Sequence, residues 1–247
     1  MALDDTKIWG ETHQDLPGVS ANSTNGPLNS TRRGALHVEP FGKGLYSIAE
    51  LGQYFIATNP TPGTGIAGIA AADGNNDEEN LVYVYNADTA SGGKRIYLDF
   101  LKLAVTAAGA NGTNISFVSK IDNTIRYTSG GSAITELNTN MDSSASSVAT
   151  IYVGALVTTA ASAYQRLVGH GPIRNVITVV GDRYLVDFGG QKNIAAGLVT
   201  SGTAISHILI PHAPVVLGPG DCWMFQVNAA SQSGASSYEF ELGYWEL

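Results

Sequence analysis

The sequence predicts an all-β fold, a two-sheet β-sandwich of the jelly-roll type with an extended N-terminal arm. Three observations indicate it. Apolar and polar residues alternate with period two in several short segments, glycine-rich turns separate these segments, and no capped, periodic stretch of helical length occurs. A chain of 247 residues is long enough to build one large sandwich around a single core.

Residues 1–35 form the predicted arm, and residues 36–247 the predicted sandwich domain. The apolar residues of the arm are scattered without periodicity among serine, asparagine and threonine. Such a segment cannot by itself bury enough apolar surface to offset the entropy lost on ordering. It is either an unordered terminus or an arm that a partner orders, and Ile8 and Trp9 favour the arm. The candidate partner contacts are Ile8, Trp9, Leu16, Leu28, Arg32 and Arg33.

The C-terminal segment has the clearest strand pattern. Its aromatic and aliphatic residues fall on one face and Glu239 and Glu241 on the other, as expected of a strand with one buried face. The predicted strands are 53–58, 81–86, 114–121, 183–188, 222–227 and 238–244, with further strands at 150–157, 164–169, 174–180 and 206–217. Glycine pairs between strands predict turns, among them Gly92-Gly93, Gly130-Gly131 and Gly189-Gly190.

Residues 95–105 change face midway. Ile96, Leu98 and Phe100 alternate, but the apolar residues that follow fall on the other face. A β-bulge near Phe100 explains the change, because a bulge inserts one extra residue into a strand. A helix could bring Ile96, Phe100 and Leu103 together, yet the preceding glycine pair and the β-rich surroundings favour a strand.

Composition argues against several classes of function. The net charge is −8, with only 13 lysines and arginines, whereas nucleic-acid binders cluster such residues against phosphates. Anionic membrane surfaces are disfavoured for the same reason. Cys222 is the only cysteine, so no internal disulfide is expected. The N-terminal residues have no basic and apolar signal-peptide pattern, and we therefore expect synthesis in a cytoplasm without export.

Two short motifs match nucleotide-site signatures without their context. Residues 63–68 fit GxGxxG, but a dinucleotide site needs a βαβ unit around it, and Asn-Pro-Thr-Pro precedes this motif. Residues 187–189 spell the kinase DFG triplet without the other kinase elements. We interpret the first as a glycine-rich loop and the second as a strand that ends in a turn. No cofactor is expected.

Possible metal ligands are equally incomplete. His207 and His212 are five positions apart, so on a strand they face opposite sides and one ion does not easily bind both. One core or interface histidine and one exposed histidine is the simpler interpretation. Residues 73–79 resemble a calcium loop, but only Asp73, Asn75 and Asp77 fit the EF-hand spacing. An acidic, solvated loop explains them more simply, and a calcium site of another type stays open.

Residue types used by hydrolases occur only in weak patterns. Cys222 lies beside Trp223 at the start of a predicted strand, and we interpret it as a small core residue rather than a nucleophile. Glu239 and Glu241 lie roughly 7 Å apart along one strand face, a spacing that a glycosidase pair could use. A solvated face, or a sheet edge charged against aggregation, explains the pair more simply. No catalytic residue is assigned.

Four segments carry a resemblance to virion proteins of tailed bacteriophages. They are residues 54–67 (YFIATNPTPGTGIA), 93–99 (GKRIYLD), 126–131 (RYTSGG) and 216–221 (VLGPGD). The chain resembles the capsid decoration or cement proteins of this class, and the similarity covers most of residues 45–247. It implies a β-sandwich on the virion surface and carries over no catalytic residues.

Three functional hypotheses follow. The first is a non-enzymatic decoration protein, expected to be a homotrimer, that binds and stabilises the major capsid protein of a phage shell. The second is a tail- or fibre-associated module that binds a receptor or glycan, for which Trp245 is a candidate because it lies off the predicted core face. The third and weakest is a glycan hydrolase that uses Glu239 or Glu241.

Overall fold

A computed structural model of the chain describes residues 44–69, 77–90, 92–110, 113–189, 207–230 and 232–247. The chain divides into two units, Met1–Ser47 and Ile48–Leu247, and every described strand lies in the second. The described helix, α2, spans Gly44–Glu50 and has no buried residue. None of the described helices has the length and apolar character to cross a bilayer.

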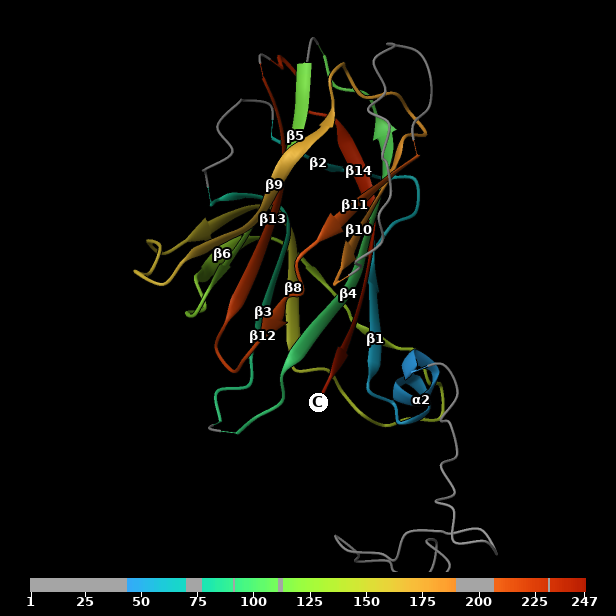
Figure 1. Ribbon diagram of the computed structural model, residues 1–247, viewed down its shortest axis with the longest axis vertical. Helices are drawn as coiled ribbons and strands as arrows, with labels where there is room; N and C mark the ends of the chain where they lie inside the picture. The colour runs from blue at the N-terminus through green and yellow to red at the C-terminus, as the bar shows by residue number, and fades with distance from the viewer. Residues whose placement is uncertain (1–43, 70–76, 91, 111–112, 190–206, 231) are drawn as a thin grey trace, which may run out of the picture. The chain divides into compact units, whose positions relative to one another are not determined.

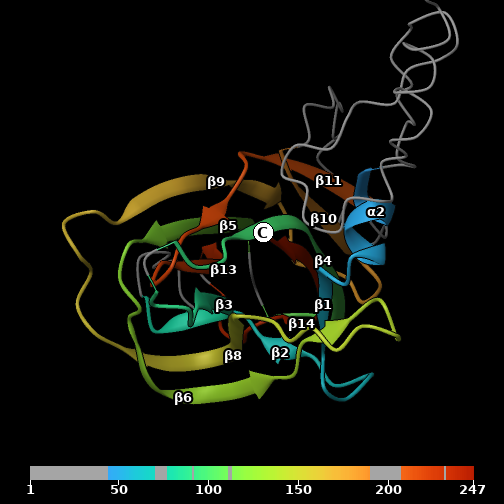
Figure 2. The same ribbon diagram turned by 90° about the horizontal axis from the view of Figure 1, so that it is seen from below.

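The described strands form two sheets, which Figures 1 and 2 show as two layers facing each other. The eight-stranded sheet has the order β11-β10-β4-β14-β1-β7, with β12 paired to β4 and β2 to β14. Its strands are β1 (Tyr54–Thr58), β2 (Ile66–Ala67), β4 (Ile96–Ala107), β7 (Leu137–Asn138), β10 (Arg183–Phe188), β11 (His207–His212), β12 (Val216–Leu217) and β14 (Ser237–Glu246).

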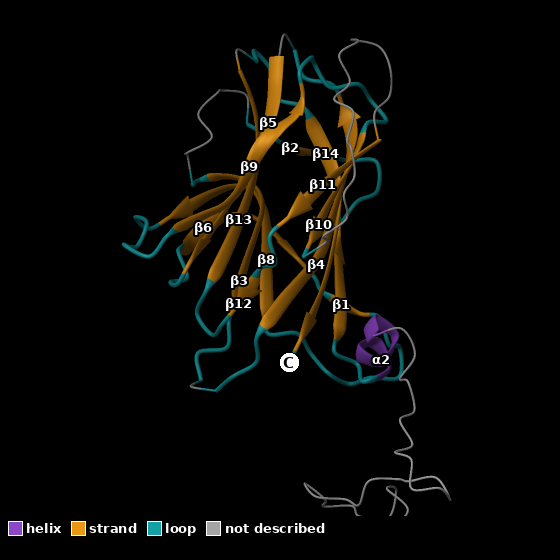
Figure 3. Cartoon of the chain, viewed as in Figure 1, coloured by secondary structure: helices purple, strands orange, loops and turns teal. Residues whose placement is uncertain are grey.

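The six-stranded sheet has the order β6-β8-β3-β13-β5-β9. Its strands are β3 (Glu79–Asn86), β5 (Thr113–Asp122), β6 (Tyr127–Ile134), β8 (Ala149–Thr158), β9 (Arg166–Arg174) and β13 (Cys222–Ala230). Strands therefore dominate the described residues, as the orange elements of Figure 3 make plain, and the all-β prediction is confirmed.

The connectivity is that of a jelly roll. The central strands of one sheet run β1-β14-β4-β10 and those of the other β3-β13-β5-β9, all antiparallel to their neighbours. The chain passes between the sheets at β3–β4–β5, β9–β10 and β13–β14, and the last two strands insert between earlier ones. Two interlocked Greek keys of this kind define the fold. β11 extends one sheet in parallel with β10.

Alternating side chains from both sheets build one main core. On β14, Tyr238, Phe240, Leu242 and Tyr244 are buried as the alternation predicts. Trp223 lies at 0% exposure and donates its indole N–H to the Ser119 hydroxyl at 2.8 Å, which satisfies the buried polar group of a large aromatic ring. The inner faces of the two sheets thus meet through apolar residues.

The predicted β-bulge in residues 95–105 is confirmed. β4 pairs with β14 through Gly243↔Phe100 and then Tyr244↔Leu98, which leaves Asp99 as the extra residue. The alternation resumes beyond it, so that Ile96 and Leu98 on one side of the bulge and Leu101 on the other all face the core.

Three local predictions of strands and turns are wrong. Residues 206–217 were expected to form one strand, but β11 ends at His212 and pairs with β10, whereas β12 is a separate strand at Val216–Leu217 that pairs with β4. Residues 174–180 were expected to be a strand, but β9 ends at Arg174. The chain then turns, because Asp182 accepts hydrogen bonds from both Arg174 and the Val179 backbone N–H. Gly130 and Gly131 were expected to form a turn between strands, but they lie inside β6 at a register shift, with φ values of 83° and 67°.

The remaining motif interpretations can be compared with their local structure. Residues 63–68 form a loop that contains the short strand β2, with no helix after it among the described residues, so the loop interpretation is confirmed. Residues 187–189 end β10 in a turn at Gly189, as expected. The boundary between the arm at 1–35 and the domain at 36–247 stays a prediction, because residues 1–43 lie outside the described part of the chain.

Candidate binding surfaces on the outer sheet faces

The outer face of the eight-stranded sheet contains a hollow of about 650 Å³. Strands β1, β4, β10, β11 and β14, together with the loop after β1, contribute its lining. Because strand side chains alternate, residues next to the buried Leu103, Tyr184 and Phe240 point outward into the hollow. These outward residues are Thr58, Lys102, Ala104, Arg183, Leu185, His207, Leu209, Glu239 and Glu241.

Charged residues in the hollow are arranged around apolar ones. Leu185 and Leu209 are half-buried on the adjacent strands β10 and β11, where they are register partners. Arg183 and His207 precede them by two residues and are exposed. A partly apolar hollow with charged groups beside it has the composition expected of a site that binds another molecule.

Glu239 and Glu241 both line this hollow, and each already has a partner within the chain. Glu241 forms an ion pair with Lys102 at 2.7 Å across the β4–β14 register, and Glu239 accepts a hydrogen bond from the Gly63 backbone N–H. The suggestion that these residues mark a sheet edge is wrong, because β14 lies between β4 and β1. The two carboxylates instead form part of a central, half-buried surface.

Aromatic residues continue this outer face towards the β4 bulge. Tyr97 and Trp245 are register partners whose rings stack with centroids 5.6 Å apart and planes within 1°. The hydroxyl of Tyr54 donates a 2.7 Å hydrogen bond to the extra residue of the bulge, Asp99. Burial, helped by the nearby charge of Asp187, raises the pKa of Asp99 despite that hydrogen bond. Trp245 therefore lies off the core face, as predicted, and packs on its own chain.

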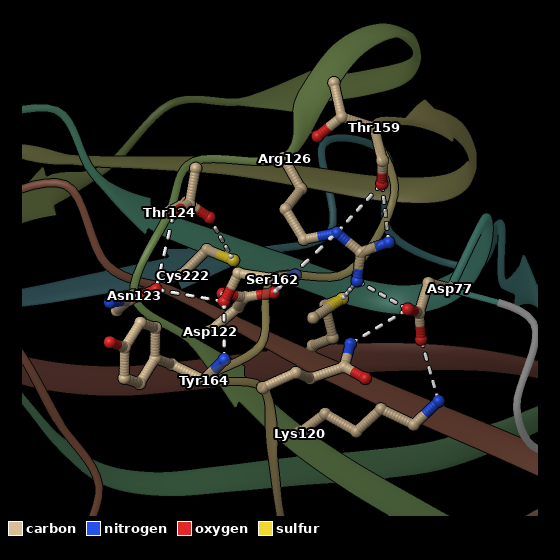
Figure 4. Close-up of polar contacts among 12 residues, drawn as sticks. Asp77, Lys120, Asp122, Asn123, Thr124, Arg126, Thr159, Ser162, Tyr164 and Cys222 are labelled. Carbon is tan, nitrogen blue, oxygen red and sulfur yellow. Dashed lines mark hydrogen bonds and ion pairs between the residues drawn. The ribbon is translucent and has the colours of Figure 1, made fainter.

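The outer face of the six-stranded sheet carries a buried polar cluster (Figure 4). Asp77 accepts hydrogen bonds from Lys120 at 2.7 Å, from Gln165 at 2.9 Å and from Arg126. Burial alone would raise the pKa of Asp77, but these donors hold it below its ordinary value. The expectation of a solvated acidic loop is wrong for Asp77, whose carboxylate is neutralised by buried cations.

Further hydrogen bonds attach a neighbouring loop to the same surface. Asp122 accepts hydrogen bonds from the backbone and hydroxyl of Ser162, and Arg126 donates to the carbonyl of Thr159 (Figure 4). These contacts join the end of β5 and the residues that follow it to the connection between β8 and β9. The cluster therefore has a structural explanation. Among the described residues, no group of three or more histidine, cysteine or acidic side chains is placed to hold a metal ion.

The buried thiol and the two histidines match the simpler interpretations of the sequence. Cys222 is fully buried, and burial raises the pKa of its thiol to about 11, so the nucleophilic thiolate is scarce near neutral pH. His207 is exposed, whereas His212 is 6% exposed between the rings of Phe117 and Phe188. The two histidines therefore face opposite sides, as their spacing predicts.

The candidate partner contacts of the arm are not tested by this structure. Ile8, Trp9, Leu16, Leu28, Arg32 and Arg33 all lie outside the described residues. Conversely, the sequence reasoning missed Arg183, Lys102 and Leu209 as surface candidates. The alternation of β10 indicated that Arg183 faces outward, but only the sheet order brings it beside β11 and near Lys102.

Comparisons with known proteins identify no relative: no protein-family model, no curated protein and no solved structure matches the chain.

Proposed function

We propose that this chain is a non-enzymatic structural protein that binds and stabilises the capsid shell of a tailed phage through protein–protein contacts. The observation that carries the proposal is the hollow on the outer face of the eight-stranded sheet. It lies mainly on the paired strands of a sheet, with a contribution from the loop after β1, and it combines apolar side chains with charges of both signs. Such a surface suits a partner that presents the same contact many times.

The composition of the chain supports a protein partner. Only 14% of its residues are charged, against about 25% in an average protein. The removal of charged groups from water is a large cost of forming an interface, and burying this surface removes few of them. In this proposal the major capsid protein is the partner, the chain acts as a homotrimer, and residues 1–35 extend over neighbouring capsid subunits.

A second candidate is a tail-associated module that binds a receptor glycan. The stacked pair of Tyr97 and Trp245 favours it, because aromatic rings on a sheet surface offer apolar faces with polar neighbours. In this alternative, the aromatic pair and the carboxylate of Asp99 would contact a sugar. The two candidates differ in where the protein lies on the virion.

Immunogold labelling of purified virions separates the candidates. Virions would be prepared from the genome that encodes this chain and labelled with antibodies raised against residues 48–247. We expect gold particles over the head. Labelling confined to the tail or its fibres would support the glycan-binding candidate. Virions without label would contradict both candidates, provided that the same antibodies bind the denatured chain in a control.

A further inference from the structure

Four tyrosines gather on the outer face of the six-stranded sheet. Tyr83 and Tyr85 come from β3, Tyr152 from β8 and Tyr127 from β6, so three neighbouring strands contribute. The rings of Tyr127 and Tyr152 stack with centroids 3.9 Å apart and planes within 16°. The other pairs of these four tyrosines that are in ring contact have centroids 6.0–6.4 Å apart.

We propose that Tyr127 and Tyr152 form an oxidative cross-linking site, at which a peroxide and a haem peroxidase join the two rings as dityrosine. The proposal does not depend on the function proposed above. It rests on the stacked geometry, on the position of the two residues in neighbouring strands and on their partial exposure.

The stack suits the bond-forming step. Each phenol first loses one electron and its hydroxyl proton, which gives two tyrosyl radicals. A carbon–carbon bond then forms between ring positions next to the hydroxyls, along the π lobes that face each other in a stack. The ring protons at those positions move to the oxygens and restore two phenols. Two hydrogen atoms leave in total, and one hydrogen peroxide takes them up to become two water molecules.

The polar surroundings of the pair hold the hydroxyls in place for this reaction. The hydroxyl of Tyr127 donates to the Gly130 carbonyl at 3.1 Å. A hydrogen bond between the two tyrosine side chains raises the pKa of Tyr152. Together with the 3.9 Å ring stack, this contact brings the two phenol groups close to each other.

The position of β6 allows the rings to move after coupling. A finished dityrosine cannot keep its rings stacked face to face, so one strand must shift. β6 is the last strand in the order of the described sheet, and it contains Gly130 and Gly131 at a register shift. The cross-link would then join this strand covalently to β8.

Neighbouring tyrosines serve as internal controls. Tyr83 is 0% exposed, and its hydroxyl accepts hydrogen bonds from the backbone N–H groups of Arg126 and Tyr127, so an oxidant in solution does not reach it. Tyr164 is 62% exposed and lies outside the stack. If exposure alone governed the reaction, Tyr164 would react first and would join one molecule to another.

The test is to oxidise the full-length chain with hydrogen peroxide and a haem peroxidase. Cleavage after Arg126 and after Glu136 separates the two tyrosines into different peptides. We expect dityrosine fluorescence in the monomer band, and a peptide pair lighter than its sum by two hydrogen atoms. Fragmentation of this pair should place the bond between Tyr127 and Tyr152.

Three single variants decide between the stack and simple exposure. Tyr127→Phe and Tyr152→Phe should each reduce the fluorescence of the monomer band to that of unoxidised protein, whereas Tyr164→Phe should leave it unchanged. Circular dichroism would verify that each variant is folded. The inference is overturned if wild-type protein forms dityrosine only between molecules, or if the cross-link within the monomer persists in Tyr127→Phe.

Discussion

At the scale of single residues, burial decides the chemistry of the groups that looked most reactive in the sequence. Cys222 and His212 are both enclosed, and each behaves as a packing residue with a polar atom. His212 lies against Phe117 and Phe188, and its Nδ1 contacts the Ala213 carbonyl at 2.7 Å. Its Nε2 has no hydrogen-bond partner among the residues that the structure describes. A charged imidazole is therefore disfavoured at this position.

The first prediction concerns the pH dependence of stability. Burial lowers the pKa of His212 below its ordinary value, so the unfolded chain binds this proton more readily than the folded one. The stability that the folded protein gains from keeping His212 neutral is fully present above the unfolded pKa of about 6.5. This stability is lost as the pH falls below that value towards the folded pKa. Urea unfolding between pH 8 and pH 5 measures the loss.

Two variants isolate the contribution of this side chain. His212→Gln should have a lower stability at pH 8 but a flatter pH dependence than the wild type. His170→Gln removes an exposed histidine on β9 and should keep the wild-type slope. An unchanged slope in His212→Gln would mean that another group causes the acid destabilisation.

At the scale of elements, a buried ion pair fixes the passage from one sheet to the other. Arg174 ends β9 and Asp182 precedes β10, and their side chains meet at 2.6 Å with both at 0% exposure. The hydroxyl of Tyr184 also donates to Asp182 at 3.3 Å. This pair holds the connection between β9 and β10, and hence one side of the hollow.

The second prediction follows from the cost of a buried, incompletely neutralised charge. Asp182→Asn leaves the Arg174 guanidinium without its carboxylate and should lower the free energy of unfolding by about 3–5 kcal/mol. Glu241→Gln removes the partly exposed ion pair with Lys102 and should change the free energy of unfolding by at most about 1 kcal/mol. Chemical denaturation of both variants gives the comparison, and equal losses would contradict this account.

The sequence predicted well those elements that depend on local pattern. Alternation located β10 and β14 and the inward faces of both, and the change of face in residues 95–105 predicted a bulge near Phe100, one residue from its observed position at Asp99. It could not locate β6, because glycines and small polar residues carry no alternation. It also misjudged residues 174–180, where apolar residues follow Arg174 but the turn depends on Asp182.

At the scale of the whole molecule, the candidate surface depends on strand order, which no local pattern encodes. The hollow combines residues from β1, which is early in the chain, with β11 and β14 near its end. Sequence reasoning named Glu239 and Glu241 from one strand, but it could not bring them beside Arg183 and Leu209. The described core lies entirely within the unit Ile48–Leu247.

The third prediction therefore concerns residues 1–35, which we expect to be needed neither for folding nor for the contacts between the three copies of the chain. Deleting residues 1–35 should leave thermal unfolding, followed by circular dichroism, close to that of the full chain, because none of the described core residues is removed. Size exclusion coupled to light scattering should find a trimer with and without the arm. A monomer only in the shortened chain would place the trimer contacts in the arm instead.

The most direct test of the central claim is rebinding of the purified chain to phage heads that lack it. Heads would be prepared from a phage whose gene for this chain is deleted, and co-sedimentation would measure saturation. We predict saturable binding by the full chain, weaker binding after removal of residues 1–35, and weaker binding of Arg183→Glu, which alters the hollow. Arg166→Glu, at another exposed arginine that lies on the other sheet, should bind as the wild type does. Failure of the folded wild-type chain to bind these heads would contradict the account.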